Sequence, residues 1–196
     1  MRYKELKNVM IKSDVQLDAK GLACPMPIVK TKKAMNDLTE GQILEVQATD
    51  KGSTADLKAW SESVGHQYIG TRVEDNVLLH YIRKSNDDTS YEKQFEQTIT
   101  NEEVINRVAN SGIILDVREE AEYAFGHIEG SKSIPMGDLE HRFDELNHDE
   151  EIYVICRTGT RSDFAAQKLF KKGFTKVYNV LPGIGSWNGN LSKSIK

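Results

Sequence analysis

The chain of 196 residues contains two cysteines, and each one begins a short segment that could support reactive thiol chemistry. The first segment is Cys24-Pro25-Met26-Pro27, and the second is Cys156-Arg157-Thr158-Gly159-Thr160-Arg161. The nucleophilic form of a cysteine is its thiolate, and thiolates attack sulfur–sulfur bonds. A chain that places both of its cysteines at such positions is therefore predicted to carry sulfur from one thiol to another.

Cys156 lies where a parallel α/β sheet usually places its chemistry. It follows the apolar run Ile152–Ile155, which is typical of a buried strand, and it precedes a short loop and a helix. Backbone N–H groups of a loop that contains Gly159 can converge on the cysteine, and the next helix N-terminus favours negative charge there. Arg157 and Arg161 add positive charge. The alternative of an inert core cysteine is disfavoured, because two flanking arginines would be costly to bury.

Three separated segments resemble the rhodanese sulfurtransferase domain, over about residues 95–196. They are Ile114-Leu115-Asp116-Val117-Arg118, then Gly126-His127-Ile128-Glu129-Gly130-Ser131 with Ile134-Pro135, then the Cys156 loop continued to Ser162. The resemblance implies that Cys156 takes sulfur from a sulfane donor and holds it as a persulfide. It also implies that Asp116 and Arg118 brace the site. The backbone amides that would cradle the terminal sulfur belong to the loop of Arg157, Thr158, Gly159, Thr160 and Arg161.

The size of this loop separates two chemistries that rhodanese-like folds support. Four residues stand between Cys156 and Arg161, whereas phosphatases of this fold place five there to surround a phosphate. The shorter loop favours sulfur transfer over a phosphatase or an arsenate reductase. One departure from the family lies outside the loop, at Pro182, where glycine is frequent, and we expect it to alter packing only.

Cys24 is predicted to sit at the N-cap of a helix. Pro25 suits the first turn, where its missing N–H would have no partner, and Pro27 falls in the same turn. The two prolines would hold Cys24 at the helix N-terminus, where the helix dipole favours a thiolate. The plain alternative is a small residue at a tight turn.

The surroundings of Cys24 are similar to the TusA (SirA-like) sulfur-carrier family, over residues 13–84. The similarity rests on the helix after Ser53, on Ala48-Thr49-Asp50 and on Leu17-Asp18-Ala19-Lys20-Gly21-Leu22-Ala23-Cys24-Pro25-Met26-Pro27. Lys20 stands where family members often have arginine, which preserves the charge. The family implies that Cys24 accepts a persulfide and passes it on, and that this part folds as a two-layer α/β sandwich.

The apolar spacing of the first half predicts the element order βαβαββ. Helices are expected at Pro25–Leu38 and from Ser53 to Gly65, and strands at Val15–Leu17, Ile43–Ala48, His66–Ile69 and Asn76–Ile82. Ser53 and Asp56 resemble a capping box at the start of the second helix. Because each helix has one apolar face, the economical packing puts both helices on one face of a four-stranded sheet.

The second half alternates strands and helices, which predicts a three-layer α/β domain with a parallel sheet. Strands are expected at Ile113–Val117, Ile152–Ile155 and Lys176–Val180, and helices at Thr100–Val108, Glu119–Phe125 and Ser162–Lys172. The first of these helices begins with a capping box formed by Thr100 and Glu103. Ligands of such sheets bind at the carboxyl ends of the strands, which is where Cys156 stands.

The length suits two domains, joined by the polar stretch 85–94, which has no apolar periodicity. We expect a sulfur-carrier domain at residues 13–84 and a rhodanese-like domain at residues 95–196. The first 84 residues have a net charge of +2 and the remaining residues a net charge of −6. Neither part has the basic excess that is typical of nucleic-acid-binding proteins.

The chain is expected to be cytoplasmic and free of metals. No apolar run approaches the roughly 20 residues of a transmembrane helix, and no apolar stretch follows the basic N-terminal residues as it would in a secretory signal. Cytoplasmic thiols stay reduced, so no structural disulfide is expected. No metal or other cofactor is predicted, because the cysteines lie 132 positions apart and the five histidines lack ligand spacing. His127 is expected to be a hydrogen-bonded structural residue.

The sequence predicts a sulfur relay. Cys156 accepts sulfur from thiosulfate, glutathione persulfide or polysulfide, and Cys24 carries it to a protein or small-thiol acceptor. No binding to membranes or nucleic acids is expected, while a homo-oligomer, either direction of transfer, and transfer within or between chains all fit the sequence. The alternative is a non-catalytic carrier or adaptor that receives persulfide from a cysteine desulfurase.

Overall fold

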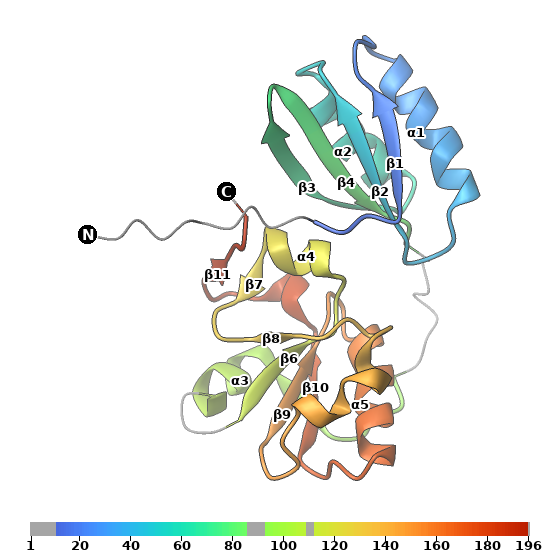
Figure 1. Cartoon of the computed structure of the whole chain (residues 1–196). Coiled ribbons are helices and arrows are strands. Elements are labelled where there is room, and N and C mark those ends of the chain that lie inside the picture. The colour runs from blue at the N-terminus through green and yellow to red at the C-terminus, as the bar shows by residue number, and fades with distance from the viewer. Residues whose placement is uncertain (1–10, 86–92, 109–111, 196) are drawn as a thin grey trace. The chain divides into compact units, whose positions relative to one another are not determined.

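The computed structural model describes residues 11–85, 93–108 and 112–195 (Figure 1). The chain divides into two compact units, residues 1–90 with Lys196, and residues 91–195. The first ten residues, which were considered for a secretory signal, lie outside the described residues, and so do residues 86–92 of the expected linker. Each unit has a hydrophobic core of its own.

The N-terminal unit has the predicted order βαβαββ. Its elements are β1 (Val15–Ala19), α1 (Met26–Asp37), β2 (Ile43–Ala48), α2 (Ser53–Ser63), β3 (Gln67–Glu74) and β4 (Val77–Arg83). The sheet order is β1-β2-β4-β3, with β1 parallel to β2 and the other neighbours antiparallel. Met35 of α1 and Leu57 of α2 are buried against Leu44, Val46 and Ile82 of the sheet. The expected two-layer sandwich is confirmed.

The start of α2 differs from the prediction. The N-cap residue is Gly52, which has no side chain to cap with, and Ser53 is already helical and 2% exposed. The Ser53 hydroxyl donates to the carbonyl oxygen of Asp50 and lies 2.9 Å from Nε2 of His80. The capping box expected from Ser53 and Asp56 is therefore wrong, because the buried His80 ring and the Asp50 carbonyl engage the serine hydroxyl.

The C-terminal unit alternates strands and helices around a parallel sheet. Its elements are β5 (Thr98–Thr100), α3 (Asn101–Val108), β6 (Ile113–Asp116), α4 (Glu120–Phe125), β7 (His127–Ile128), β8 (Lys132–Ser133), β9 (Ile152–Ile155), α5 (Thr160–Lys171), β10 (Val177–Leu181) and β11 (Leu191–Ser192), with 3-10 turns at Leu139–His141, Phe143–Glu145 and Ile184–Ser186. Five parallel strands follow the order β5-β10-β9-β6-β8, while β7 and β11 form a separate antiparallel pair.

Helices cover both faces of this sheet. Leu169 of α5 packs in a cluster with Leu115 and Val154, whereas Val104 of α3 packs in a second cluster with Ile114. Because successive residues of a strand point to opposite faces, Ile114 and Leu115 show that the two clusters lie on opposite sides of β6. The expected three-layer arrangement is confirmed.

The helix boundaries agree with the prediction to within two residues. At α3 the Glu103 N–H donates to Thr100 Oγ1 at 3.2 Å, and the Thr100 N–H donates to the Glu103 carboxylate at 2.9 Å. This capping box is confirmed. The helix α5 begins at Thr160 rather than at Ser162, so it starts closer to Cys156 than the sequence indicated.

Candidate functional site

Cys156 directly follows β9, at the carboxyl end of the parallel sheet, and is 1% exposed. Its Sγ atom accepts a hydrogen bond from the Gly159 N–H at 3.2 Å and lies 3.3 Å from the Ser162 hydroxyl oxygen. The N-terminus of α5, a helix of 12 residues, stands behind the same sulfur. The Gly159 amide and the helix dipole can stabilise negative charge on the sulfur.

The turn of the loop depends on Gly159. This residue is the N-cap of α5 and has a φ of +90°, a conformation that side chains of L-residues disfavour. A Cβ atom at this position would collide with the Leu181 side chain and lie 3.2 Å from Nζ of Lys93. A glycine is therefore needed here for both conformation and space.

A second segment, residues 183–185, holds the loop from outside. The Ile184 N–H donates to the carbonyl oxygen of Cys156 at 2.8 Å, and the Gly185 N–H donates to that of Arg157 at 3.0 Å. Gly183 has a φ of +103°, and a Cβ on it would lie 2.7 Å from both carbonyl oxygens. Pro182 stays outside the loop, but the residues that follow it support the loop backbone directly, which the sequence analysis missed.

Three buried polar residues complete the support of the loop and of the segment before it. The Ser162 hydroxyl donates to Asn179 Oδ1 at 2.7 Å, and Asn179 Nδ2 donates to the carbonyl oxygen of Gly159 at 3.2 Å. The Asp163 carboxylate accepts the backbone N–H groups of Gln94 and Phe95. Sequence reasoning missed these residues, although Asn179 stands out as a polar residue inside a buried strand, which normally needs a partner.

The two loop arginines have different surroundings. Arg161 makes a two-pronged ion pair with the Glu122 carboxylate, at 2.7 and 2.9 Å, and the Glu122 side chain is fully buried. Arg157 is exposed, as is Thr158. Positive charge from both arginines was expected at the loop, but the charge of Arg161 is neutralised by the Glu122 carboxylate of α4.

Asp116 and Arg118 form a buried pair at the carboxyl end of β6. Arg118 Nη2 lies 2.6 Å from the Asp116 carboxylate and also donates to the carbonyl oxygen of Gly126 at 2.7 Å. Strand β6 lies beside β9, which leads to Cys156. This geometry fits the predicted bracing role, because the pair links the end of β6 to the end of α4.

Cys24 occupies a different position from the one predicted. The helix α1 begins at Met26 with Pro25 as its N-cap, so Cys24 precedes the N-cap by one residue, and the Cys24–Pro25 peptide bond is cis. Pro27 lies in the first turn as expected. The Met26 N–H donates to the carbonyl oxygen of Ala23 at 3.0 Å. The start of this helix therefore offers the Cys24 sulfur few hydrogen-bond donors, since the two prolines have no N–H.

The charges around Cys24 also differ from the expectation. The pKa of the exposed Cys24 thiol is raised above its ordinary value, first by its hydrogen bond to the Asp56 carboxylate, then by desolvation and by the charges of Asp56 and Asp50. Both carboxylates converge at Gly52, where a Cβ would lie 3.4 Å from an Asp50 oxygen and 3.8 Å from an Asp56 oxygen. The expected stabilisation of a Cys24 thiolate is therefore opposed by two acidic side chains.

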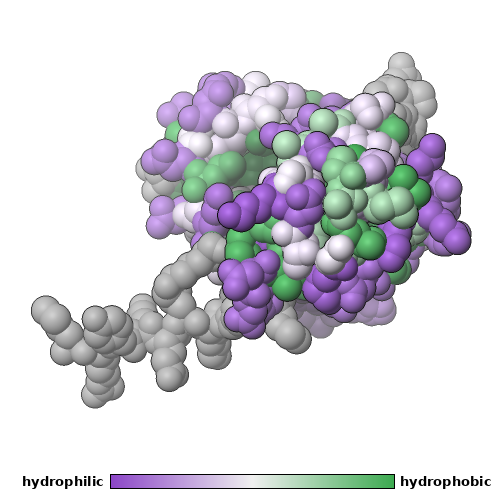
Figure 2. All heavy atoms as spheres, turned by 90° about the horizontal axis from the view of Figure 1, so that it is seen from above, coloured by the Kyte–Doolittle hydropathy of each residue, from purple (hydrophilic) through white to green (hydrophobic). Residues whose placement is uncertain are grey.

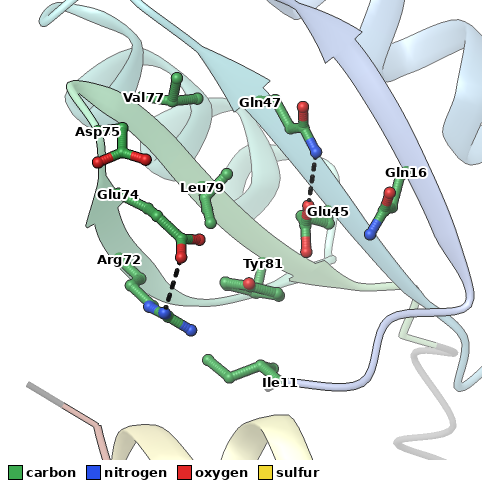
Figure 3. A pocket seen from close by; sticks show the side chains of 10 residues that line it. All are labelled: Ile11, Gln16, Glu45, Gln47, Arg72, Glu74, Asp75, Val77, Leu79 and Tyr81. Atoms are coloured by element: carbon green, nitrogen blue, oxygen red, sulfur yellow. Dashed lines mark hydrogen bonds and ion pairs between the residues drawn. The ribbon is translucent and has the colours of Figure 1, made fainter. Parts of the chain in front are cut away.

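A separate hollow of about 460 Å³ lies on the sheet face of the N-terminal unit that α1 and α2 do not cover (Figure 3). Figure 3 shows Glu45, Gln47 and Tyr81 pointing into it, and Gln47 donates to the Glu45 carboxylate at 2.9 Å. Neither cysteine lines this hollow. Both cysteines therefore lie at the ends of secondary-structure elements rather than in this hollow.

The surface mixes polar residues with apolar patches, as Figure 2 shows for the face seen from above. Met26 and Val29, at the start of α1, are 45% and 53% exposed. Among residues 11–85, 93–108 and 112–195, no helix is both long and apolar enough to span a membrane. Within the same ranges, no group of three or more His, Cys, Asp or Glu side chains is arranged to hold a metal ion.

Comparisons with known proteins cover both units. Residues 15–84 match the family described as "Sulfurtransferase TusA", and residues 100–190 match the family described as "Rhodanese-like domain". The chain is 49% identical over 189 residues to "Putative sulfur carrier protein YrkF" of Bacillus subtilis, which covers 92% of this chain and 98% of that protein. The chain belongs to the TusA–rhodanese fusion family. Membership assigns the protein to sulfur transfer.

Further similar proteins match one domain of this TusA–rhodanese chain. "Putative sulfur carrier protein YrkI" of Bacillus subtilis is 62% identical over 74 residues, 38% of this chain and 99% of that protein. "Sulfur carrier protein TusA" of Allochromatium vinosum is 40% identical over 72 residues, 37% of this chain and 95% of that protein. A rhodanese-related protein of Thermoplasma volcanium is 30% identical with a TM-score of 0.47, covering 49% of this chain and 97% of that chain.

Proposed function

We propose that this protein is a sulfurtransferase that moves sulfane sulfur as cysteine persulfides, with Cys156 as the accepting thiol and Cys24 as the relay. The observation that carries the proposal is the Gly159 N–H at 3.2 Å from the Cys156 sulfur, in a loop that leads into α5. A negative sulfur is present both when Cys156 attacks and when it holds an ionised persulfide. The amide and the helix N-terminus stabilise this charge in both states.

The proposed reaction consists of successive exchanges of sulfur–sulfur bonds. The Cys156 thiolate attacks the sulfane sulfur of a donor such as thiosulfate, its electron pair forms the new bond, and sulfite leaves with the electrons of the old one. The Cys24 thiolate then attacks the outer sulfur of this persulfide, and Cys156 departs as a thiolate. An acceptor thiol removes the sulfur from Cys24 in the same way. Atoms and electrons balance without a further oxidant or cofactor.

The surroundings of the two sulfurs support different partners. Cys156 is 1% exposed, and the exposed cations Arg157 and Lys93 lie at its loop. A small anionic donor such as thiosulfate, polysulfide or glutathione persulfide fits such a sulfur better than a bulky protein loop does. Cys24 is exposed beside the apolar side chains of Met26 and Val29, which suits a protein acceptor. The reaction needs both thiols reduced, as they are in the cytoplasm, where we propose that it operates.

The test is to load the protein with thiosulfate and to record intact masses for the parent, Cys24→Ser and Cys156→Ser. We expect the parent and Cys24→Ser to gain about 32 Da, the mass of one sulfur atom, by the exchange chemistry above. Both should also form thiocyanate with cyanide. Cys156→Ser should neither gain sulfur nor form thiocyanate quickly. If Cys156→Ser loads and turns over like the parent, Cys156 is not the entry point. If loaded Cys156 never passes sulfur to Cys24, the relay is wrong.

A non-catalytic carrier or adaptor is the second candidate, and the burial of Cys156 together with the printed names of the relatives favours it. In that case Cys24 would receive persulfide from a protein donor such as a cysteine desulfurase. The two candidates differ in one measurement, because a pure carrier forms no thiocyanate from thiosulfate and cyanide at catalytic amounts.

A further inference from the structure

The two candidate thiols differ in what surrounds a negative sulfur. At Cys156, the Gly159 N–H donates to Sγ at 3.2 Å, while the Ser162 hydroxyl, 3.3 Å from the sulfur, gives its proton to Asn179 Oδ1. The N-terminus of α5 lies directly behind this loop. The Gly159 amide and the helix N-terminus both favour the anionic form of whatever sulfur species Cys156 carries.

At Cys24 the corresponding groups are missing or opposed. Pro25 and Pro27 have no N–H, and the Met26 N–H is used by the carbonyl oxygen of Ala23. The Asp56 carboxylate is the first cause of the raised pKa of the Cys24 thiol and can only accept a hydrogen from it, and the Asp50 carboxylate, which also lies against Gly52, adds a second negative charge.

The cation nearest to Cys24 in the sequence does not offset these acids. The Lys20 ammonium lies 2.7 Å from the Gln47 side-chain oxygen and 3.2 Å from the Asp18 carboxylate. Its charge is therefore shared with another acid. The surroundings of Cys24 therefore stabilise a neutral thiol, which can donate to Asp56, and destabilise an anionic sulfur.

This contrast bears on the exchange of sulfur between the two sites. Whichever cysteine is loaded, the negative charge of its persulfide lies on the outer sulfur, so the exchange moves an anionic sulfur from one protein environment to the other. In the exchange one sulfur–sulfur bond breaks, one forms, one proton moves to the emptied cysteine, and no net oxidation occurs. The equilibrium is then set by which protein environment better stabilises the persulfide anion.

We propose that sulfane sulfur rests on Cys156 at equilibrium, and that Cys24 carries it only as a minor, strongly donating species beside Asp56 and Asp50. The proposal rests on the proposed function, whose direction of transfer it specifies. Cys156 holds the sulfur at rest, and Cys24 passes it to the acceptor. As an acceptor removes sulfur from Cys24, further sulfur moves from Cys156 to Cys24. A preference of about tenfold or more for Cys156 is expected, the size that one hydrogen bond to a charged group provides.

The test measures the distribution of sulfur between the cysteines at equilibrium. The protein is given half an equivalent of polysulfide sulfur per chain without oxygen, with a trace of glutathione so that both sites exchange freely. After alkylation and digestion, mass spectrometry of the two cysteine peptides gives the ratio of persulfide on Cys156 to that on Cys24. We expect a ratio of about ten or more in the parent, and the same ratio when loading begins from glutathione persulfide.

A variant beside Cys24 shifts this ratio towards that site. Asp56→Asn removes a negative charge from the surroundings of Cys24, so the share of sulfur on Cys24 rises several-fold. Glu62→Gln is the matched control, because Glu62 is an exposed acid on the same helix as Asp56. It leaves the ratio unchanged.

The outcomes separate this proposal from the relay itself. A parent ratio near one, or a ratio that favours Cys24, overturns the proposal even if sulfur passes between the sites. An unchanged ratio in Asp56→Asn overturns the role given to that carboxylate. When glutathione is omitted, failure of sulfur to cross from Cys156 to Cys24 refutes the relay, while the ratio measured with glutathione still decides where sulfur rests.

Discussion

The Cys156 sulfur receives a backbone amide, while the arginine of its motif is bound elsewhere. Gly159 supplies that amide, and Arg161 reaches across to the buried Glu122. The sequence motif predicted the loop, because its residues are contiguous. It could not predict the pairing of Arg161, because Glu122 lies 39 residues earlier and comes near only through the packing of α4 against the loop.

Gly159→Ala is expected to lower the rate of thiocyanate formation from thiosulfate and cyanide by at least about tenfold, which corresponds to ~1.4 kcal/mol. The added Cβ collides with the Leu181 side chain in a backbone conformation that alanine disfavours. The loop amide then moves away from the Cys156 sulfur.

Gly173→Ala is the matched control for this prediction. Gly173 also has a positive φ, of +95°, but a Cβ there meets nothing within 4 Å and lies at the far end of α5 from Cys156. It should cost stability and leave the rate almost intact. Equal losses of rate in both variants would show that general strain, not loop geometry, limits the reaction.

At the scale of elements, the two helices that follow the cysteines were predicted to within two residues, but the chemistry of their N-termini was not. Apolar spacing locates α1 and α5 because one face of each must be buried. The loop before α5 leaves an amide directed at sulfur, whereas the prolines of α1 remove such donors and α2 brings Asp56 to the Cys24 thiol. Contacts between elements that are distant in sequence decide this difference, and a single sequence does not reveal them.

The N-terminal unit contains a buried polar group that ties three elements together. The His80 ring contacts the hydroxyls of Ser53, Tyr68 and Thr71 and is fully buried. Burial lowers the pKa of His80 from its ordinary 6.5 to about 4. Between these two values the unfolded chain binds a proton that the folded chain does not.

We therefore expect the N-terminal unit to lose stability as the pH falls from 6.5 towards 4, with its full stability present above pH 6.5. The loss in free energy of unfolding reaches up to about 3 kcal/mol, at ~1.36 kcal/mol for each pKa unit. Urea unfolding at several pH values measures it, followed by the fluorescence of Trp60 in a Trp187→Phe background, which leaves one tryptophan.

His80→Gln should flatten this dependence on pH, whatever its effect on stability at pH 7. His141→Gln, at an exposed histidine of the other unit, should leave the Trp60 transition as in the parent. A parent whose Trp60 transition is insensitive to pH between 6.5 and 4 would contradict the assignment.

At the scale of the whole molecule, the chain joins two units with separate cores through a short connecting segment. Fusion can raise the effective concentration of one thiol for the other to the millimolar range, provided that the connection lets them meet. The polar composition of residues 85–94 predicted the junction. It could not predict that Gln94 and Phe95 would be fixed to Asp163.

A protease site inserted between Asp87 and Ser90 tests this advantage in the intact, folded protein. After cleavage, we expect sulfur transfer from loaded Cys156 to Cys24 to become dependent on protein concentration, and to slow about a hundredfold or more at 1 µM. Quenched mass spectrometry before and after cleavage gives the rates. The uncleaved insertion protein is the control. A rate that depends on concentration before cleavage as well would show that transfer occurs between chains.

The contacts at the two ends of the connecting segment determine where it joins each unit. Lys93 lies against Gly159, so the connecting segment enters the C-terminal unit beside the Cys156 loop. At the other end, the Lys84 ammonium donates hydrogen bonds to the carbonyl oxygens of Met35 and Leu38. The connecting segment therefore leaves the N-terminal unit at the end of α1 that is remote from Cys24.

Each end of the connecting segment is thus held by its own unit, one beside the Cys156 loop and the other at the end of α1 remote from Cys24. A longer connecting segment would lower the effective concentration of one thiol for the other.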